Sequence, residues 1–271
     1  MNLLAVIGNP IAHSLSPQIH KMFAAQFSFP LNYEKIESPM TGFPETVRAF
    51  LTQGAIGFNV TVPFKVEAFH LVDTLSSQAK HARAVNTVKR NESGLLEGHN
   101  TDGLGLVKDI THNLGWSIAG KRVLVLGAGG AVSGILEPIL DEDPECIHIF
   151  NRTYTKAEAL ADQYCLKVKA VKQDDLLTNY DLVISGSSAG LASAGSISAE
   201  LSIPLQVIGK NTFCYDLIYS KVETPFLAVC KGRGAGELAD GLGMLAEQAA
   251  LAFEIWFGEL PNTAPVIEIL R

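Results

Sequence analysis

The segment at residues 121–134, KRVLVLGAGGAVSG, most strongly restricts how this chain can fold. Branched apolar residues at 123–126 pass directly into Gly127, Ala128, Gly129, Gly130 and Ala131, which predicts a buried strand, a tight turn and a helix. Such a turn lets backbone N–H groups and a helix N-terminus approach a pyrophosphate. The G-x-G-x-x-G fingerprint is incomplete because Val132 replaces its third glycine, so an ordinary strand–turn–helix unit remains an alternative.

The pattern around this segment alternates between strands and helices. Strands are predicted at 123–126, 146–150, 182–185 and 213–217, with helices reaching about Leu140 and near 156–164. This alternation predicts a parallel sheet covered on both faces, with ligands at the carboxyl ends of its strands. A chain of 271 residues has room for a second domain as well.

Basic and polar residues follow the second of these strands, where the ribose of a dinucleotide would lie. Asn151, Arg152 and Thr153 stand there, followed by Lys156. An acidic residue would bind the 2′-hydroxyl of NAD, whereas Arg152 can bind a 2′-phosphate through two hydrogen bonds. NADP is therefore favoured over NAD, and a plain surface loop is the alternative.

The N-terminal part begins with a predicted strand at 3–7 and a loop that contains Ser14 and Ser16. Two hydroxyls in such a loop could hold a carboxylate. Ser16 could also cap the helix that Pro17 opens, and the two roles are compatible.

A further predicted strand carries Asn59 and Thr61 on one face and ends at Pro63. Lys65 then lies near the start of a helix, where the helix dipole does not favour a cation. Either a chemical role or ordinary solvation could explain this lysine.

Three more segments contain candidate polar residues. Residues 84–88 are predicted as a strand that includes Asn86, and 91–94 as a hairpin turn. Residues 100–103, NTDG, are typical of an Asx-turn that caps a helix beginning near Leu104. The section 237–257 has a helix pattern after Gly241, in which Gln248 is either functional or simply exposed.

Composition excludes several classes of protein. The formal net charge of −7 argues against nucleic-acid binding. The seven histidines lack metal-ligand spacing, so no metal is expected. No apolar run approaches the ~18 residues of a membrane span, and the first residues lack the basic region of a signal peptide. Four cysteines without a C-x-x-C pair fit reduced thiols and a cytoplasmic location.

A series of motifs resembles the shikimate dehydrogenase family, in family order and over nearly the whole chain. These are IGNPIAHSLSP at 7–17, NVTVPFK at 59–65, AVNT at 84–87, NTDG at 100–103, GAGGA at 127–131, NRT at 151–153, and GLGML with QAA across 241–250. The family has a G-x-G-G-[AT] loop in place of the full fingerprint, which matches the glycine turn here.

The resemblance implies two α/β domains: a substrate-binding domain at 1–102, rejoined by C-terminal helices at 238–271, and a doubly wound, Rossmann-type NADP-binding domain at 103–237. It also implies NADP-linked interconversion of 3-dehydroshikimate and shikimate, on the route through chorismate to aromatic amino acids. Membranes and nucleic acids are not expected as partners, and the chain would be a monomer or homodimer.

Residue roles carried over from the family fall into three groups. Lys65 and Asp102 would stand at the reacting oxygen, with Lys65 transferring the proton and Asp102 orienting it. Ser14, Ser16 and Tyr219 would bind the carboxylate; Thr61, Asn86 and Gln248 would bind hydroxyls, with Asn59 supporting the pocket. The cofactor would contact Gly127, Ala128, Gly129, Gly130, Ala131, Asn151, Arg152, Thr153, Lys156 and Gly241.

Two places depart from the family pattern. Ser185-Gly186-Ser187 replaces the usual Asn-Ala-Thr near the nicotinamide, and Lys221 stands where proline is common. A quinate/shikimate dehydrogenase that uses NAD or NADP is an alternative, and a catalytically silent binding protein on the same fold is another. Arg152 argues against the first, and the joint presence of Lys65, Asp102, Ser14, Ser16 and Gln248 argues against the second.

Overall fold

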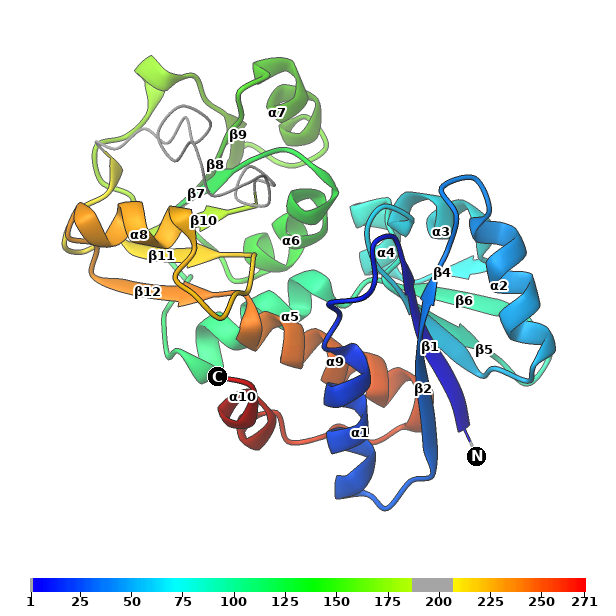
Figure 1. Ribbon diagram of the computed structural model, residues 1–271. Coiled ribbons are helices and arrows are strands. Elements are labelled where there is room, and N and C mark those ends of the chain that lie inside the picture. Colours follow the sequence, from blue (N-terminus) through cyan, green and yellow to red (C-terminus); the bar gives the residue numbers. More distant parts are fainter. Residues whose placement is uncertain (1, 187–206) are drawn as a thin grey trace. The chain divides into compact units, whose positions relative to one another are not determined.

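A computed structural model describes residues 2–186 and 207–271 (Figure 1). The chain forms two compact units, Met1–Leu106 with Leu245–Leu270, and Val107–Met244 with Arg271. The divisions fall within helix α5 (Asp102–Lys108) and helix α9 (Leu242–Phe257), so the C-terminal helices belong with the first unit.

The first unit is built on a mixed six-stranded sheet with the order β2-β1-β3-β5-β6-β4. Strands β1 and β3 run parallel, whereas β5 runs antiparallel to both β3 and β6. The strands are β1 (Asn2–Gly8), β2 (Leu31–Glu37), β3 (Gly57–Val60), β4 (Thr74–Leu75), β5 (Thr87–Arg90) and β6 (Leu96–His99).

Separate apolar clusters pack within the first unit. One joins the sheet to α2 (Phe43–Thr52), α3 (Lys65–Leu71) and α4 (Ser77–Ala82), through residues such as Phe50 and Phe58. Two others involve α1 (Ser16–Gln26), α9 and α10 (Ala264–Leu270), through residues such as Phe23, Phe253 and Trp256. A sheet covered in this way holds the ends of its strands rigidly, and the candidate residues lie at those ends.

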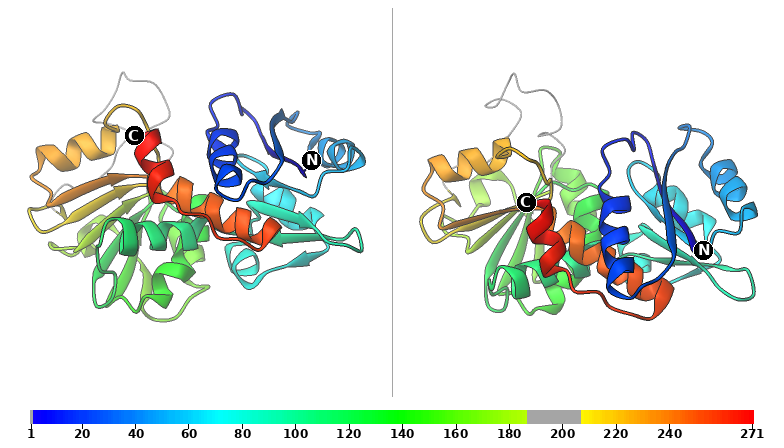
Figure 2. Two further views of the ribbon diagram at one scale, coloured as in Figure 1. Left: turned by 90° about the horizontal axis from the view of Figure 1, so that it is seen from below. Right: turned by 60° about the horizontal axis from the view of Figure 1, so that its bottom comes forward.

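The second unit contains a six-stranded parallel sheet with the order β12-β11-β10-β7-β8-β9. This is the Rossmann order, with the switch point between β7 and β10. Helix α8 packs on β11 and β12, on the face opposite to α6 (Figure 2). The elements are β7 (Arg122–Leu126), α6 (Gly130–Asp141), β8 (Cys146–Phe150), α7 (Tyr154–Ala161), β9 (Val168–Ala170), β10 (Leu182–Ser185), β11 (Phe213–Asp216), α8 (Pro225–Gly232) and β12 (Glu237–Asp240).

The incomplete glycine fingerprint has a packing explanation. Val132 is fully buried on α6, and a Cβ added to Gly186 at the end of β10 would lie 2.4 Å from its side chain. The third glycine of the standard fingerprint permits close packing of helix on strand. Here Gly186 on the neighbouring strand provides that space, so the valine is accommodated.

Several local predictions are confirmed. Strands β8 and β10 have the predicted bounds, and residues 91–94 form the turn of the β5–β6 hairpin, with Gly94 at φ 84°. The Asx-turn is also present, because the backbone N–H of Asp102 donates to Oδ1 of Asn100 at 3.1 Å.

Two local predictions are wrong. Ser16 is the first residue of α1 and its side chain does not cap the helix; Leu15 occupies the N-cap position. Asn86 precedes β5, which begins at Thr87, although its backbone still bonds to Val60 on β3 and His99 on β6. Strand β12 at 237–240, which pairs with β11, was not predicted, whereas the helix expected after Gly241 is present as α9.

Among the described residues, none of the helices has the length and apolar character that crossing a membrane requires.

His20 lies fully buried among aromatic rings of the first unit. Its ring stacks on Tyr33 with centroids 4.5 Å apart, and the Phe23 and Trp256 rings lie beside it. Burial lowers the pKa of His20 from 6.5 to about 3, and the neighbouring Asn59 side chain opposes this shift more weakly. The ring is therefore neutral in the folded protein at ordinary pH.

Replacing His20 by Phe should flatten the dependence of stability on pH. In the wild type the unfolded chain takes up a proton below pH 6.5 that the folded chain does not take up until about pH 3. The contribution of neutral His20 to the free energy of unfolding is therefore fully present above this window. Within the window it falls by up to about 1.4 kcal/mol for each unit that the pH is lowered. Urea unfolding at several pH values between about 4 and about 8 measures the slope of stability against pH.

The matched control is His70→Gln, because His70 is an exposed histidine on α3. This control should keep the wild-type slope. An unchanged slope in His20→Phe would contradict the inference that His20 is held neutral by burial.

Candidate active site

The centre of the candidate site is an ion pair between Lys65 and Asp102. Lys65 is the first residue of α3 and Asp102 the first residue of α5. The lysine Nζ lies 2.6 Å from Oδ2 of the carboxylate, and the side chains are 26% and 12% exposed. A half-buried lysine with a charged partner is not the solvated surface residue that the alternative interpretation required.

Asn86 holds the other oxygen of this carboxylate. Its Nδ2 donates to Oδ1 of Asp102 at 2.9 Å and to Oγ1 of Thr101 at 2.8 Å. Its Oδ1 accepts from the backbone N–H of Thr101 at 3.0 Å. That backbone group can only donate, so it fixes which end of the amide faces Asp102.

Gln248 joins the same group from α9. Its Oε1 accepts from Nδ2 of Asn86 at 3.3 Å, and its own Nε2 donates to the carbonyl of Leu245 at 2.9 Å. A Cβ added to Gly105 on α5 would lie only 2.6 Å from the backbone nitrogen of Gln248. Glycine at 105 therefore allows α5 and α9 to approach closely enough for Gln248 to reach Asn86.

Asn59 extends the network on the side away from the ion pair. Its Oδ1 accepts from the Tyr33 hydroxyl at 2.6 Å, and its Nδ2 donates to the Asn86 carbonyl at 3.1 Å and to Oγ1 of Thr87 at 3.0 Å. The Thr87 hydroxyl then donates to Oδ1 of Asn86 at 2.9 Å. Asn59 is 6% exposed, so it supports the polar cluster from within the protein.

Ser14 and Ser16 lie together in the loop that leads into α1. Their hydroxyls are 3.2 Å apart, and the backbone N–H of Ser16 donates to Oγ of Ser14 at 3.3 Å. Ser16 also interacts with the Tyr33 hydroxyl. Two hydroxyls so placed can both turn toward an anion.

Thr61 follows β3 directly and packs against the loop after β1. Its backbone N–H donates to the Ile7 carbonyl, and its own carbonyl accepts from the Phe64 N–H. A Cβ added to Gly8 would lie only 2.3 Å from the Thr61 methyl group. No hydrogen-bond partner of its hydroxyl occurs among the described residues. The hydroxyl is therefore available to a ligand.

The first unit thus brings together most of the residues selected from sequence, and adds four that were not selected. Tyr33, Thr87, Thr101 and Gly105 complete the contacts described above. Thr87 and Thr101 lie inside the AVNT and NTDG motifs, so the sequence offered a reason to select them. Nothing in the sequence pointed to Tyr33 and Gly105, since their partners lie far away in the chain.

The glycine turn of the second unit is open where an anion would bind. Gly127 has φ 113°, a conformation that favours glycine, and its N–H donates to the Phe150 carbonyl at 2.8 Å. Gly129 is the N-cap of the twelve-residue helix α6, and Gly130 is its first residue. A Cβ at either position would meet nothing within 4 Å, so the helix N-terminus can be approached closely.

The residues after β8 are exposed and basic. Asn151 folds this turn by donating from Nδ2 to the Thr153 carbonyl at 2.8 Å, and Thr153 is the N-cap of α7. Arg152 and Lys156 are both exposed. The cation of Arg152 thus follows the strand that neighbours the glycine turn, as a 2′-phosphate site requires.

Gly241 lies where the backbone itself is crowded. A Cβ there would be 2.3 Å from the carbonyl oxygen of Leu217, so only glycine allows this approach. The segment that follows is held by Tyr215, whose hydroxyl donates to Asp109 at 2.7 Å and accepts from the Met244 N–H at 3.3 Å. Tyr219 lies half-buried in the same unit, after β11.

The departures from the family pattern are only partly described. Ser187 lies outside the described residues, whereas Ser185 is buried at the end of β10. Lys221 is exposed.

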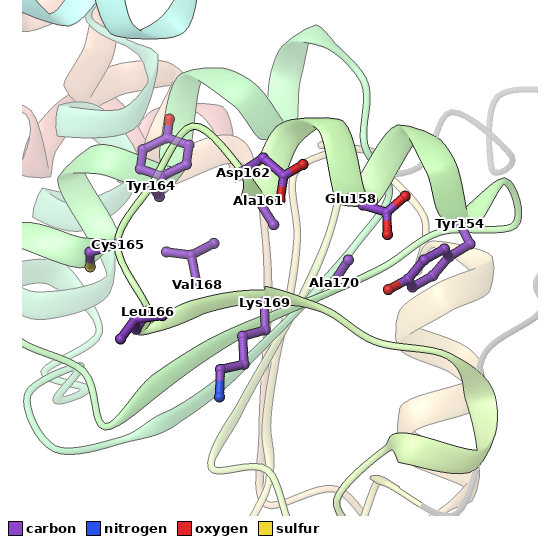
Figure 3. A pocket seen from close by; sticks show the side chains of 10 residues that line it. All are labelled: Tyr154, Glu158, Ala161, Asp162, Tyr164, Cys165, Leu166, Val168, Lys169 and Ala170. Carbon is purple, nitrogen blue, oxygen red and sulfur yellow. The ribbon is translucent and has the colours of Figure 1, made fainter.

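A pocket of about 390 Å³ in the second unit is distinct from the glycine turn (Figure 3). It lies between α7 and the edge strand β9, and Tyr154, Glu158, Tyr164 and Lys169 are among its lining residues. None of the residues selected for the cofactor from sequence lines this pocket.

Comparison with known proteins gives the same assignment over most of the chain. Residues 6–88 match the shikimate dehydrogenase substrate binding domain, 107–199 match shikimate / quinate 5-dehydrogenase, and 241–271 match the shikimate 5′-dehydrogenase C-terminal domain.

Individual relatives agree with these matches. The chain is 50% identical to a shikimate dehydrogenase (NADP(+)) of Alcanivorax borkumensis, over 99% of this chain and 96% of that one. The crystal structure of an Ael1 enzyme from Pseudomonas putida has a TM-score of 0.92 at 40% identity, covering 100% and 98% of the two chains. Shikimate 5-dehydrogenase from Thermus thermophilus, solved with NADP(H) and shikimate, has a TM-score of 0.86 at 32% identity, covering 99% and 98%. This chain belongs to the shikimate dehydrogenase family.

Proposed function

We propose that this chain is an NADP-dependent oxidoreductase that interconverts 3-dehydroshikimate and shikimate by hydride transfer. The observation that carries the proposal is the Lys65–Asp102 ion pair, held by Asn86 in a polar cluster that also contains Gln248. The NADP-dependent relatives at about half identity over nearly the full chain support the same reaction.

The first unit binds the substrate in this proposal. The paired hydroxyls of Ser14 and Ser16 bind its carboxylate. The family resemblance also assigns Tyr219, a residue of the second unit, to this carboxylate. Thr61, Asn86 and Gln248 hydrogen-bond its hydroxyl groups, while Asn59 holds Asn86 in place from behind. Neutral donors suit a carboxylate here, because they bind it without a second buried charge that would have to lose its water.

Lys65 moves the proton at the reacting oxygen. When a ketone carbon accepts hydride, negative charge develops on its oxygen, and an ammonium group that donates to this oxygen stabilises the charge and supplies the proton. Asp102 accepts from Nζ of Lys65 and so restricts the direction of that group. In the reverse reaction the same lysine receives the proton from the substrate hydroxyl.

The second unit binds NADP, which supplies and accepts the hydride. Gly127 to Ala131 and the N-terminus of α6 bind its pyrophosphate through backbone N–H groups. Arg152, with Asn151, Thr153 and Lys156 beside it, binds the 2′-phosphate. Gly241, where the backbone is crowded, would also contact the cofactor.

We also propose a biological setting for this reaction. The enzyme acts in the cytoplasm on the route through chorismate to the aromatic amino acids, as a monomer or homodimer, and binds small molecules only. The quinate/shikimate dehydrogenase alternative would accept quinate and NAD, and Arg152 disfavours it because a guanidinium gains most from a 2′-phosphate.

Turnover with paired substrates and cofactors tests the function. Purified protein should oxidise shikimate and reduce NADP. The long-wavelength absorbance of the reduced cofactor measures this reaction directly. Quinate and NAD should each be poorer. Absence of turnover in every pairing would refute the enzyme assignment, and a preference for quinate or NAD would favour the alternative.

Replacing Lys65 by Met tests the proton-transfer role. Removal of the ammonium group should lower kcat by roughly 10²- to 10⁴-fold, the range typical of general acid–base groups, with little change in KM for shikimate. Steady-state kinetics in the direction of shikimate oxidation measure both constants. A large rise in KM at unchanged kcat would show that Lys65 only binds substrate.

Replacing Arg152 by Ala tests the 2′-phosphate site. KM for NADP should rise by roughly 10- to 100-fold, as expected for losing a hydrogen-bonded ion pair worth about 1.5–3 kcal/mol, whereas KM for NAD should change little.

The control is Lys169→Ala, which removes an equal charge from the pocket between α7 and β9. It should leave both cofactor constants unchanged. If Lys169→Ala raised KM for NADP and Arg152→Ala did not, the 2′-phosphate would have to be assigned to that pocket.

A further inference from the structure

A single buried tyrosine touches both halves of the proposed substrate site. The Tyr33 hydroxyl donates to Oδ1 of Asn59 at 2.6 Å, and the Ser16 side chain also hydrogen-bonds to it. Ser16 belongs to the carboxylate-binding pair, whereas Asn59 leads to Asn86 and the ion pair. Tyr33 comes from the middle of β2 and is 4% exposed.

The hydrogen bonds beyond Asn59 have a determined direction. Nδ2 of Asn59 faces the Asn86 carbonyl, which can only accept, so its Oδ1 must face Tyr33. The Thr87 hydroxyl accepts from the same Nδ2 and therefore has its one proton for Oδ1 of Asn86. Nδ2 of Asn86 is then left to face Asp102.

Burial makes any other arrangement of these hydrogen bonds costly. Thr87 is 0% exposed and Asn86 is 2% exposed, so water does not replace a missing partner at low cost. Burial also raises the pKa of Tyr33 well above 10.0, which keeps its hydroxyl protonated and donating throughout the neutral range. The His20 ring stacked on Tyr33 at 4.5 Å restricts the position of the phenol.

We infer that Tyr33 and Thr87 are positioning residues for the dehydrogenase reaction. Thr87 donates directly to the amide oxygen of Asn86, and Tyr33 holds Asn59, which donates to Thr87. Together with the backbone N–H of Thr101, these bonds hold the amide of Asn86 so that it donates to Asp102, which in turn directs Lys65. Tyr33 also ties this orientation to the hydroxyl of Ser16, so that the carboxylate end and the reacting end of the site are aligned with each other. This inference rests on the proposed roles of Ser16, Lys65 and Asp102.

Replacing Tyr33 by Phe tests the inference with the smallest change of shape. We expect kcat/KM for shikimate to fall about tenfold, which corresponds to a loss of about 1.4 kcal/mol, with KM for NADP unchanged. The matched control is Tyr180→Phe, which removes a buried phenolic hydroxyl bonded to Nδ1 of His148 at 2.6 Å in the second unit. The control should lose comparable stability but keep the wild-type kinetics with shikimate.

Thr87 provides a second pair of variants, in case Tyr33→Phe does not fold. Thr87→Val keeps the shape and removes the hydroxyl, and it should lower kcat/KM for shikimate about tenfold; Thr87→Ser keeps the hydroxyl and should recover activity to within about threefold of wild type. Equal activity of the Val and Ser variants would overturn the role of the hydroxyl.

A double-mutant cycle tests the link to the carboxylate-binding pair. Ser16→Ala and Tyr33→Phe should be non-additive in kcat/KM, because the two hydroxyls contact each other. Additive effects, or a Tyr33→Phe enzyme as active as Tyr180→Phe, would overturn the inference. If Lys65→Met were also without effect, the proposed site itself would be wrong, so the two failures are distinguishable.

Discussion

The ion pair between Lys65 and Asp102 imposes the main constraint on the first unit. Both charged groups are mostly removed from water, and such a pair is stable only where further hydrogen bonds satisfy the remaining oxygens. Asn86 supplies that bond, and it can do so because β3, β5 and β6 are neighbours in the sheet. Strand order therefore decides that Lys65 after β3, Asn86 before the antiparallel β5 and Asp102 after β6 form one cluster.

The polar cluster around the ion pair fixes the orientation of its hydrogen-bonding groups. Each of its two asparagine amides faces a backbone group that has only one hydrogen-bonding role: a carbonyl for Asn59 and an N–H for Asn86. The threonine and tyrosine hydroxyls complete the set, so donors and acceptors are aligned before any ligand arrives. Preorganised dipoles of this kind need no rearrangement when charge develops during a reaction. The aromatic packing around His20 and Trp256 supports this alignment from the apolar side.

The second unit achieves a dinucleotide turn without the full glycine fingerprint. The requirement that a third glycine normally meets is space between helix and strand, and Gly186 meets it from β10 while Val132 fills the helix side. What a phosphate needs is retained: a positive φ at Gly127 and an open helix N-terminus at Gly129 and Gly130. A missing motif position is thus compatible with the same function when a neighbouring element compensates for it.

The sequence by itself determined the family, the parallel sheet of the second unit and the bounds of strands such as β8 and β10, because these depend on local periodicity and turn residues. It also identified Lys65, Asp102, Asn86 and Gln248 as candidates through motifs. It misassigned the cap at Ser16 and missed strand β12, where contacts beyond the local segment decide the structure.

Only the tertiary structure decided how those candidates are held. Gln248 reaches Asn86 across 162 residues of chain, and Tyr33 reaches Asn59 across 26. Gly105 permits the first of these contacts by leaving room for the α9 backbone. Hydrogen-bond direction and close helix packing depend on which segments meet in space, and no local pattern in the chain encodes that meeting.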